Sequence, residues 1–82
     1  MEDGIYRYTR YFEREVLRKR TYLEKRLCVR VIENPVLVRR QADGRYCFWA
    51  AVPEMGGRYL RVVTLEDRVT IHNAFLDRGL RR

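Results

Sequence analysis

The chain has 82 residues, 46% of them apolar, and its 18 basic and 11 acidic residues give a formal net charge of +7. This length accommodates one domain with a single core, and the apolar fraction excludes an intrinsically disordered chain. All but two of the basic residues are arginine, which binds phosphate in a planar, bidentate geometry but also accumulates through genome composition or adaptation to heat. The net charge favours an anionic partner, either nucleic acid or an acidic protein.

The two cysteines, Cys28 and Cys47, lack the spacing of a zinc or redox site and are expected to be buried free thiols. The chain also lacks the glycine-rich phosphate loops and serine-hydrolase motifs of common enzyme classes, so we expect no metal and no other cofactor. Its first residues lack the apolar segment of a signal peptide, and no apolar run approaches 18 residues. These features predict a cytoplasmic protein that does not bind a membrane.

Hydrophobic periodicity divides the chain into the following elements: a short edge strand that 5–8 could add, helices over 9–20 and 21–34, strands over 36–41, 45–52, 58–65 and 69–73, and a tail over 74–82. Thr9 is the expected N-cap of the first helix. Thr21 and Glu24 have the T-x-x-E spacing of a capping box, which predicts that the second helix begins there. This helix ends at Asn34, because the residue before a proline avoids the helical region. The predicted fold class is α+β, a single domain with an N-terminal helical hairpin packed on a four- or five-stranded antiparallel meander.

The strand pattern also predicts how the meander pairs. A hairpin loop at 42–44, with Gly44 at positive φ, places Arg39 opposite Cys47. The next connection, over 53–57, places Ala50 opposite Leu60 in the same way.

The last hairpin, around residues 66–68, admits two registers. A two-residue loop puts Val69 and Ile71 on the helix side of the sheet and His72 on the opposite side. A three-residue loop reverses these positions, because strand side chains alternate with a period of two. We predict the two-residue loop, since it buries Val69 and Ile71.

The face of the meander that points away from the helices, here called the open face, is expected to be basic and aromatic. The residues that could bind or act there are Arg39, Arg45, Trp49, Tyr59, Arg61 and His72, with Arg78 in the tail. Guanidinium groups hold phosphates, and aromatic rings stack on unpaired bases. The open face is therefore a candidate surface for RNA.

RNA cleavage by the 2′-hydroxyl requires a base, an acid and a group that stabilises the charge on the phosphorane. His72 is the candidate acid or base, because its reference pKa of about 6.5 lies near neutrality. Arg61 and Arg45 are the candidate catalytic ligands of the phosphate. The residues expected to bind the nucleic acid are Arg39, Trp49, Tyr59 and Arg78.

Structural roles are the alternative for several of these residues. A lone histidine near a strand end is often a hydrogen-bonded structural residue, and this alternative applies to His72. Trp49 could pack under the N-terminal segment instead of meeting a base. Asp77 and Arg78 could form an ion pair that fixes the tail.

Two resemblances follow from these patterns. The segment ADGRYCFWAAVPEMGGRYLRVVTLEDRVTIHNAFLDR resembles a family of small bacterial proteins of unassigned function, which has the phrases QxDGRxxFW, LRVVTLEDG and HNAFxDR. Arg68 stands where that family prefers glycine. The order of elements and the basic open face resemble the RelE/ParE-like toxin fold, although this sheet has no lysine.

The toxin resemblance implies cleavage of mRNA on the ribosome without a metal, and an acidic antitoxin that covers the site. By position it implies roles for Arg45, Arg61, His72 and Arg78. The leading hypothesis is thus a basic RNA-binding protein that acts as a toxin-like, metal-independent endoribonuclease. The alternative is a non-catalytic module that binds an acidic protein or forms a homodimer.

Overall fold

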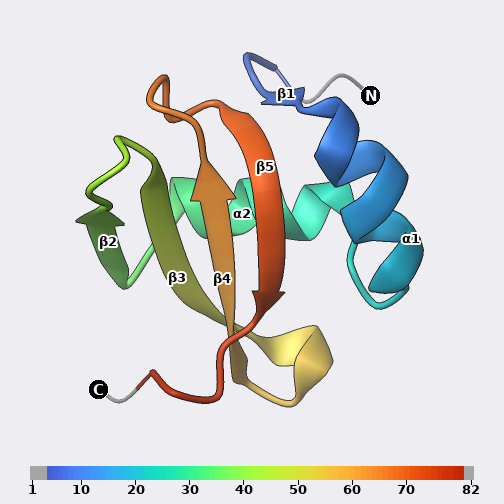
Figure 1. Cartoon of the computed structure of the whole chain (residues 1–82). Helices are drawn as coiled ribbons and strands as arrows, with labels where there is room; N and C mark the ends of the chain where they lie inside the picture. Colours follow the sequence, from blue (N-terminus) through green and yellow to red (C-terminus); the bar gives the residue numbers. More distant parts are fainter. Residues whose placement is uncertain (1–3, 81–82) are drawn as a thin grey trace.

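Five strands form one sheet in the order β1-β5-β4-β3-β2, and the helical segments lie behind this sheet and beside its β5 side (Figure 1). The computed structural model describes residues 4–80. Its elements are β1 (Arg7–Tyr8), the π-helical turn η1 (Phe12–Val16), α1 (Leu17–Lys19), α2 (Lys25–Glu33), β2 (Leu37–Arg40), β3 (Tyr46–Val52), the 3-10 turn η2 (Pro53–Met55), β4 (Arg58–Thr64) and β5 (Thr70–Leu76). Within this part of the chain, no helix has the length and apolar character needed to cross a membrane.

Strands β2 to β5 form an antiparallel meander in which the first two predicted registers are confirmed. Arg39 pairs with Cys47, and Ala50 pairs with Leu60. Gly44 closes the first hairpin at a φ of 91°, a conformation that a side chain would strain. The alternation therefore sends one set of side chains toward α2 and the other set to the open face.

The expectation of a purely antiparallel sheet is wrong, because β1 joins the other side of β5 in a parallel pair. Arg7 pairs with Thr70 and Tyr8 pairs with Ile71. A parallel pair needs a long connection, and here the helices and the whole meander provide it. The sheet is consequently mixed, and it brings the segment that follows β1 next to β5.

The first helix begins as predicted, since Thr9 caps it. The amide of Phe12 donates to Thr9 Oγ1 at 3.1 Å, and the amide of Glu13 donates to the Thr9 carbonyl at 3.1 Å. The helix then widens into η1 and tightens again in α1, where it ends at Lys19. A π-helical turn inserts one extra residue into the helix and frequently occurs near functional sites.

The capping box predicted at Thr21 is wrong. Thr21 lies in a turn, and α2 begins only at Lys25 with Glu24 as its N-cap in extended conformation. The Glu24 carboxylate accepts a hydrogen bond from Arg26 Nε at 2.8 Å instead of returning to the backbone. The turn allows Leu23 to enter the core, where 6% of its surface is exposed, and this burial outweighs a local cap.

The main core lies between the helices and the inner face of the sheet. Its large, deeply buried members are Phe12, Val16, Leu27, Val31, Val52, Leu60, Val62 and Ile71. The chain continues as β5 where a tail was predicted, and Ala74 is fully buried there. A second, smaller cluster lies on the open face and contains Cys47, Trp49 and Val63 with Leu37 and Leu80 packed against them.

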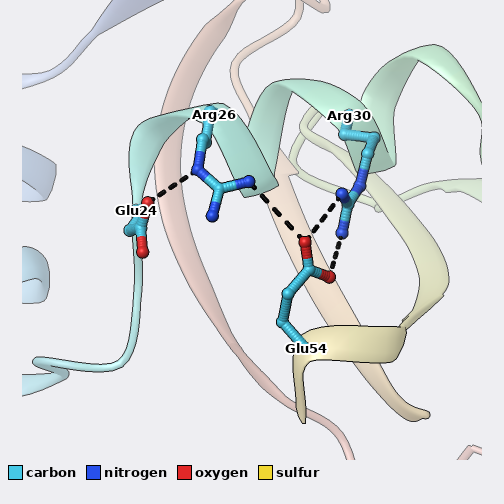
Figure 2. A network of polar contacts seen from close by, with 4 residues as sticks. All are labelled: Glu24, Arg26, Arg30 and Glu54. Atoms are coloured by element: carbon cyan, nitrogen blue, oxygen red, sulfur yellow. Dashed lines mark hydrogen bonds and ion pairs between the residues drawn. The ribbon is translucent and has the colours of Figure 1, made fainter. Parts of the chain in front are cut away.

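An ion-pair network ties α2 to the connection between β3 and β4. Glu54 in η2 accepts two hydrogen bonds from Arg30, at 2.6 and 3.0 Å, and its carboxylate lies 3.6 Å from Arg26 Nη1 (Figure 2). The hydrogen bonds from Arg30 lower the pKa of Glu54 to about 2. The bidentate geometry fixes where the second connection sits against α2.

Candidate functional site

The loop between β4 and β5 is longer than the predicted two-residue loop. The amide of Leu65 donates to the carbonyl of Thr70, and the amide of Arg68 donates to the carbonyl of Leu65. The Asp67 carboxylate accepts from the amides of Val69 and Thr70. Arg68 adopts a φ of 65°, a left-handed conformation that favours glycine. Val69 therefore lies in the loop, only partly buried.

A β-bulge next to this loop puts Asn73 on the same face as His72. Thr64 pairs with Ile71 and Val63 pairs with Asn73, so His72 is an extra residue in β5. Ile71 stays on the helix side, fully buried as predicted, while His72 and Asn73 both lie on the open face. The bulge thus places two adjacent polar side chains on one face, which a regular strand does not allow.

These side chains line a hollow on the open face of about 370 Å³, here called the polar hollow. Its lining residues are Tyr11, Gln41, Arg45, Arg61, Val63, His72, Asn73 and Phe75. The three residues predicted to be catalytic, His72, Arg61 and Arg45, are all in this set. The polar hollow therefore combines two guanidinium groups, one imidazole, two carboxamides and two aromatic rings.

His72 is held by the beginning of the first helix. Its Nδ1 lies 3.0 Å from Thr9 Oγ1, and its ring lies against that of Tyr11 with a centroid separation of 5.0 Å. Because the Thr9 oxygen already accepts from the amide of Phe12, it has one lone pair and its own proton left for the imidazole. Burial and the charge of Arg45 lower the pKa of His72 below its ordinary value of 6.5. The imidazole is consequently neutral at neutral pH.

Arg61 has a guanidinium group with few good partners. It lies between two rings, 5.2 Å from the centroid of Trp49 and 5.3 Å from that of Phe75. Its Nη2 donates to Cys47 Sγ at 3.3 Å, and its Nη1 lies 3.9 Å from Asp77 Oδ2. Its Nε is buried without a hydrogen-bond partner in the described part of the chain. Sulfur is a weak acceptor, so most of the hydrogen-bonding capacity of this group is unused.

A second hollow of about 190 Å³, here called the apolar hollow, lies at the ends of β4 and β5 that adjoin η2, where Tyr59 faces the open side and Leu76 faces the main core. It is lined by Arg58, Tyr59, Leu76, Asp77, Arg78 and Leu80. Tyr59 and Arg78, both predicted to bind nucleic acid, therefore lie here and not in the polar hollow. Its wall is mostly apolar, with Tyr59 and two leucines in it, and two arginines also line it.

The surroundings of Trp49 differ from those of an exposed stacking platform. Only 6% of its surface is exposed, because Leu80 packs against it. Its indole Nε1 donates to Asp77 Oδ2 at 2.9 Å, and Asp77 has its ion pair with Arg61 in place of the one predicted with Arg78. The chain after β5 covers Trp49. The alternative considered from the sequence was that Trp49 packs under the N-terminal segment.

Arg39 is exposed on the outer strand β2 and belongs to neither hollow. Conversely, five residues of the polar hollow were not among the predicted site residues: Tyr11, Gln41, Val63, Asn73 and Phe75. Tyr11 arrives there because β1 pairs with β5, and Asn73 because of the bulge. The hydrophobic pattern allowed an edge strand over 5–8, but it has no signal for the parallel pairing with β5 or for the bulge. The aromatic residue Phe75, two positions before Asp77, could have been found by extending the last strand.

Among residues 4–80, no three His, Cys, Asp or Glu side chains are grouped so as to hold a metal ion. Comparisons with known proteins found no relative of this chain. No protein-family model matches this sequence, and no curated protein or solved structure is significantly similar to it. The resemblances drawn from short phrases and element order therefore stay predictions.

Proposed function

We propose that this protein binds single-stranded RNA on the open face and cleaves it in the polar hollow without a metal, in the manner of a toxin-like endoribonuclease. The observation that carries the proposal is the position of His72 beside Arg45 and Arg61 in one hollow. Arg61 supports it further, since its guanidinium lacks a strong anionic partner. The net charge of +7 favours an RNA partner over a neutral one.

The reaction assigned to the polar hollow is attack by a ribose 2′-oxygen on the adjacent phosphorus. His72 takes the proton of the 2′-hydroxyl while the new bond from the 2′-oxygen to phosphorus forms. The bond from phosphorus to the 5′-oxygen breaks, and that oxygen takes a proton from water. Arg61 and Arg45 stabilise the extra negative charge on the phosphorane oxygens. The products are a 2′,3′-cyclic phosphate and a free 5′-hydroxyl.

The protonation state of His72 fits the role of a base. A base must be unprotonated before it acts, and the lowered pKa keeps the imidazole neutral at neutral pH. When Nδ1–H donates to Thr9 Oγ1, the lone pair of Nε2 is free to accept the proton. Thr9 thereby selects which nitrogen of His72 reacts.

The test is cleavage of RNA in the presence of EDTA, with and without ribosomes, followed by analysis of the new ends. The proposal expects cyclic phosphate ends, and it expects His72→Gln to remove cleavage while RNA binding remains. A matched control is Arg18→Ala, which removes one charge from α1 outside both hollows. Undiminished cleavage by His72→Gln would refute the assignment of the base, and absence of both binding and cleavage would refute the RNA function.

A second candidate is a non-catalytic module that binds an acidic protein, and the outer strand β2 favours it. Strand β2 is the last strand of the sheet, and Val38 on it is 40% exposed beside the exposed Arg39. An open sheet edge can accept an added strand from a partner. Light scattering and binding to an acidic extended peptide test this candidate, and Val38→Glu on this edge should weaken that binding, because its charge repels the peptide.

A further inference from the structure

We propose that the apolar hollow holds the base that adjoins the phosphate bound in the polar hollow, so that the site takes at least two consecutive nucleotides of a single strand. This inference rests on the proposed RNA function and adds to it a subsite with a defined ligand. The two hollows differ in chemistry: the polar one suits a phosphate and a ribose, and the apolar one suits an uncharged ring.

The two hollows meet at one pair of side chains. Arg61 lines the polar hollow, Asp77 lines the apolar hollow, and Arg61 Nη1 lies 3.9 Å from Asp77 Oδ2. On β4, Tyr59 is two residues from Arg61 and therefore on the same face, about 7 Å along the strand. A ligand bound to Arg61 thus reaches Tyr59 without leaving the open face.

The walls of the apolar hollow fit a base and its flanking phosphates. The ring of Tyr59 is half-buried on the sheet, with Leu76 and Leu80 beside it. A base in this position stacks on the phenol ring, a contact that tolerates any base because each has a π-face. Arg58, whose Nε donates to the Met55 carbonyl, and Arg78 also line this hollow and have further donors for a phosphate that follows or precedes the base.

The Asp77 carboxylate at the junction does not repel such a strand, because its charge is already engaged. It accepts from the Trp49 indole at 2.9 Å and from the amide of Gly79 at 2.9 Å, and it lies beside Arg61. These contacts, with the bond from Trp49 foremost, lower the pKa of Asp77. The carboxylate thus remains an internal fixing point, while the unused donors of Arg61 meet the phosphate.

The experiment compares two ligands that cannot be cleaved. One is a dinucleotide with 2′-O-methyl riboses. The other is an abasic form of the same compound, in which hydrogen replaces either the first or the second base. Binding is followed by NMR titration of the labelled protein, with a single nucleoside 3′-phosphate as the shorter reference. The wild-type protein should bind the intact dinucleotide on the order of 5- to 150-fold more tightly than one abasic form. The amide of Gly79, next to the apolar hollow, should shift only with the intact base.

The variant Tyr59→Leu removes the ring and should remove the difference between the intact and abasic ligands. The matched control Tyr6→Leu changes a tyrosine that lines neither hollow and should keep that difference. Equal affinity of intact and abasic ligands for the wild-type protein would overturn the subsite, even where RNA cleavage persists. If no nucleotide binds and no RNA is cleaved, the proposed function itself falls with it.

Discussion

Replacing Arg61 by methionine separates a binding role from a structural role. If Arg61 holds the fold together, its loss destabilises the protein; if it serves a ligand, the fold tolerates the change. Methionine keeps an unbranched side chain of similar length between the rings of Trp49 and Phe75. Asp77 keeps its hydrogen bonds from Trp49 and Gly79 in the variant, so no buried carboxylate is left without a donor.

The expected change in the free energy of unfolding is small, because Arg61 makes stabilising contacts but also has a buried donor that destabilises the folded protein. Two cation–π contacts, at 5.2 and 5.3 Å, stabilise the wild type by about 0.5–1 kcal/mol each. The long ion pair to Asp77 adds about 0–1 kcal/mol, since the Arg61 side chain is 27% exposed. Against these, the buried Nε without a partner costs about 1–3 kcal/mol. We therefore expect the free energy of unfolding of Arg61→Met to stay within about 1 kcal/mol of wild type.

Urea unfolding at pH 7 measures this free energy, and a titration with RNA at two salt concentrations measures binding. RNA affinity should fall, and the slope of log affinity against log salt should lose about 0.7 for the lost phosphate contact. The control Arg18→Met removes the same charge from α1. A loss of about 3 kcal/mol or more, as in breaking a buried ion pair, would refute the reasoning and make Arg61 structural.

Three further predictions concern titrating groups. For Glu54→Gln, the wild type should lose its stability advantage as the pH falls from about 4.5 to about 2, because the folded-state pKa of Glu54 is depressed to about 2; urea midpoints across this range would contradict this if the advantage were unchanged. Trp49→Phe should raise the pKa of Asp77 and lower the free energy of unfolding by about 1.5–3 kcal/mol at pH 7. The loss should be smaller in acid, because the ionised Asp77 carboxylate stabilises the folded protein fully only above its unfolded pKa. An equal loss at pH 3 would oppose this. In an NMR titration, His72, the only histidine, should have a lowered pKa that rises in Arg45→Gln; no change would mean that burial alone sets it.

The meander could be predicted from the sequence because local chemistry determines it. Gly44 permits the first hairpin, and strict alternation allows one register that buries Ala50 and Leu60. The predicted position of His72 on the open face was based on the burial of Ile71. That position is correct, although the predicted two-residue loop is wrong. The longer loop moves Ile71 opposite Thr64, which is also an inward position, and the bulge reverses the alternation only from Asn73 onward.

Contacts between distant segments could not be predicted. The sequence pattern allowed a short edge strand over 5–8, but β1 pairs through two residues, Arg7 and Tyr8, which is too short to indicate the partner strand β5. Leu23 enters the core and displaces the capping box, a choice made by tertiary packing and not by local propensity. Trp49 has an aromatic side chain of the kind that binding surfaces use, but it is buried by Leu80, which lies 31 positions later in the sequence.

The short parallel strand β1 also makes the site a separate unit of local stability. The short ladder with β5 and the backbone hydrogen bonds from Arg7 to Val69 and from Thr9 to Ile71 tie this segment to the sheet. We expect such a contact to open at lower free energy than the meander, whose strands β3 and β4 pair over seven residues each. Opening it would separate Thr9 and its neighbour Tyr11 from His72 while the rest of the sheet stays paired. Hydrogen exchange at the Thr9 amide therefore reports the fraction of molecules in which His72 is correctly held.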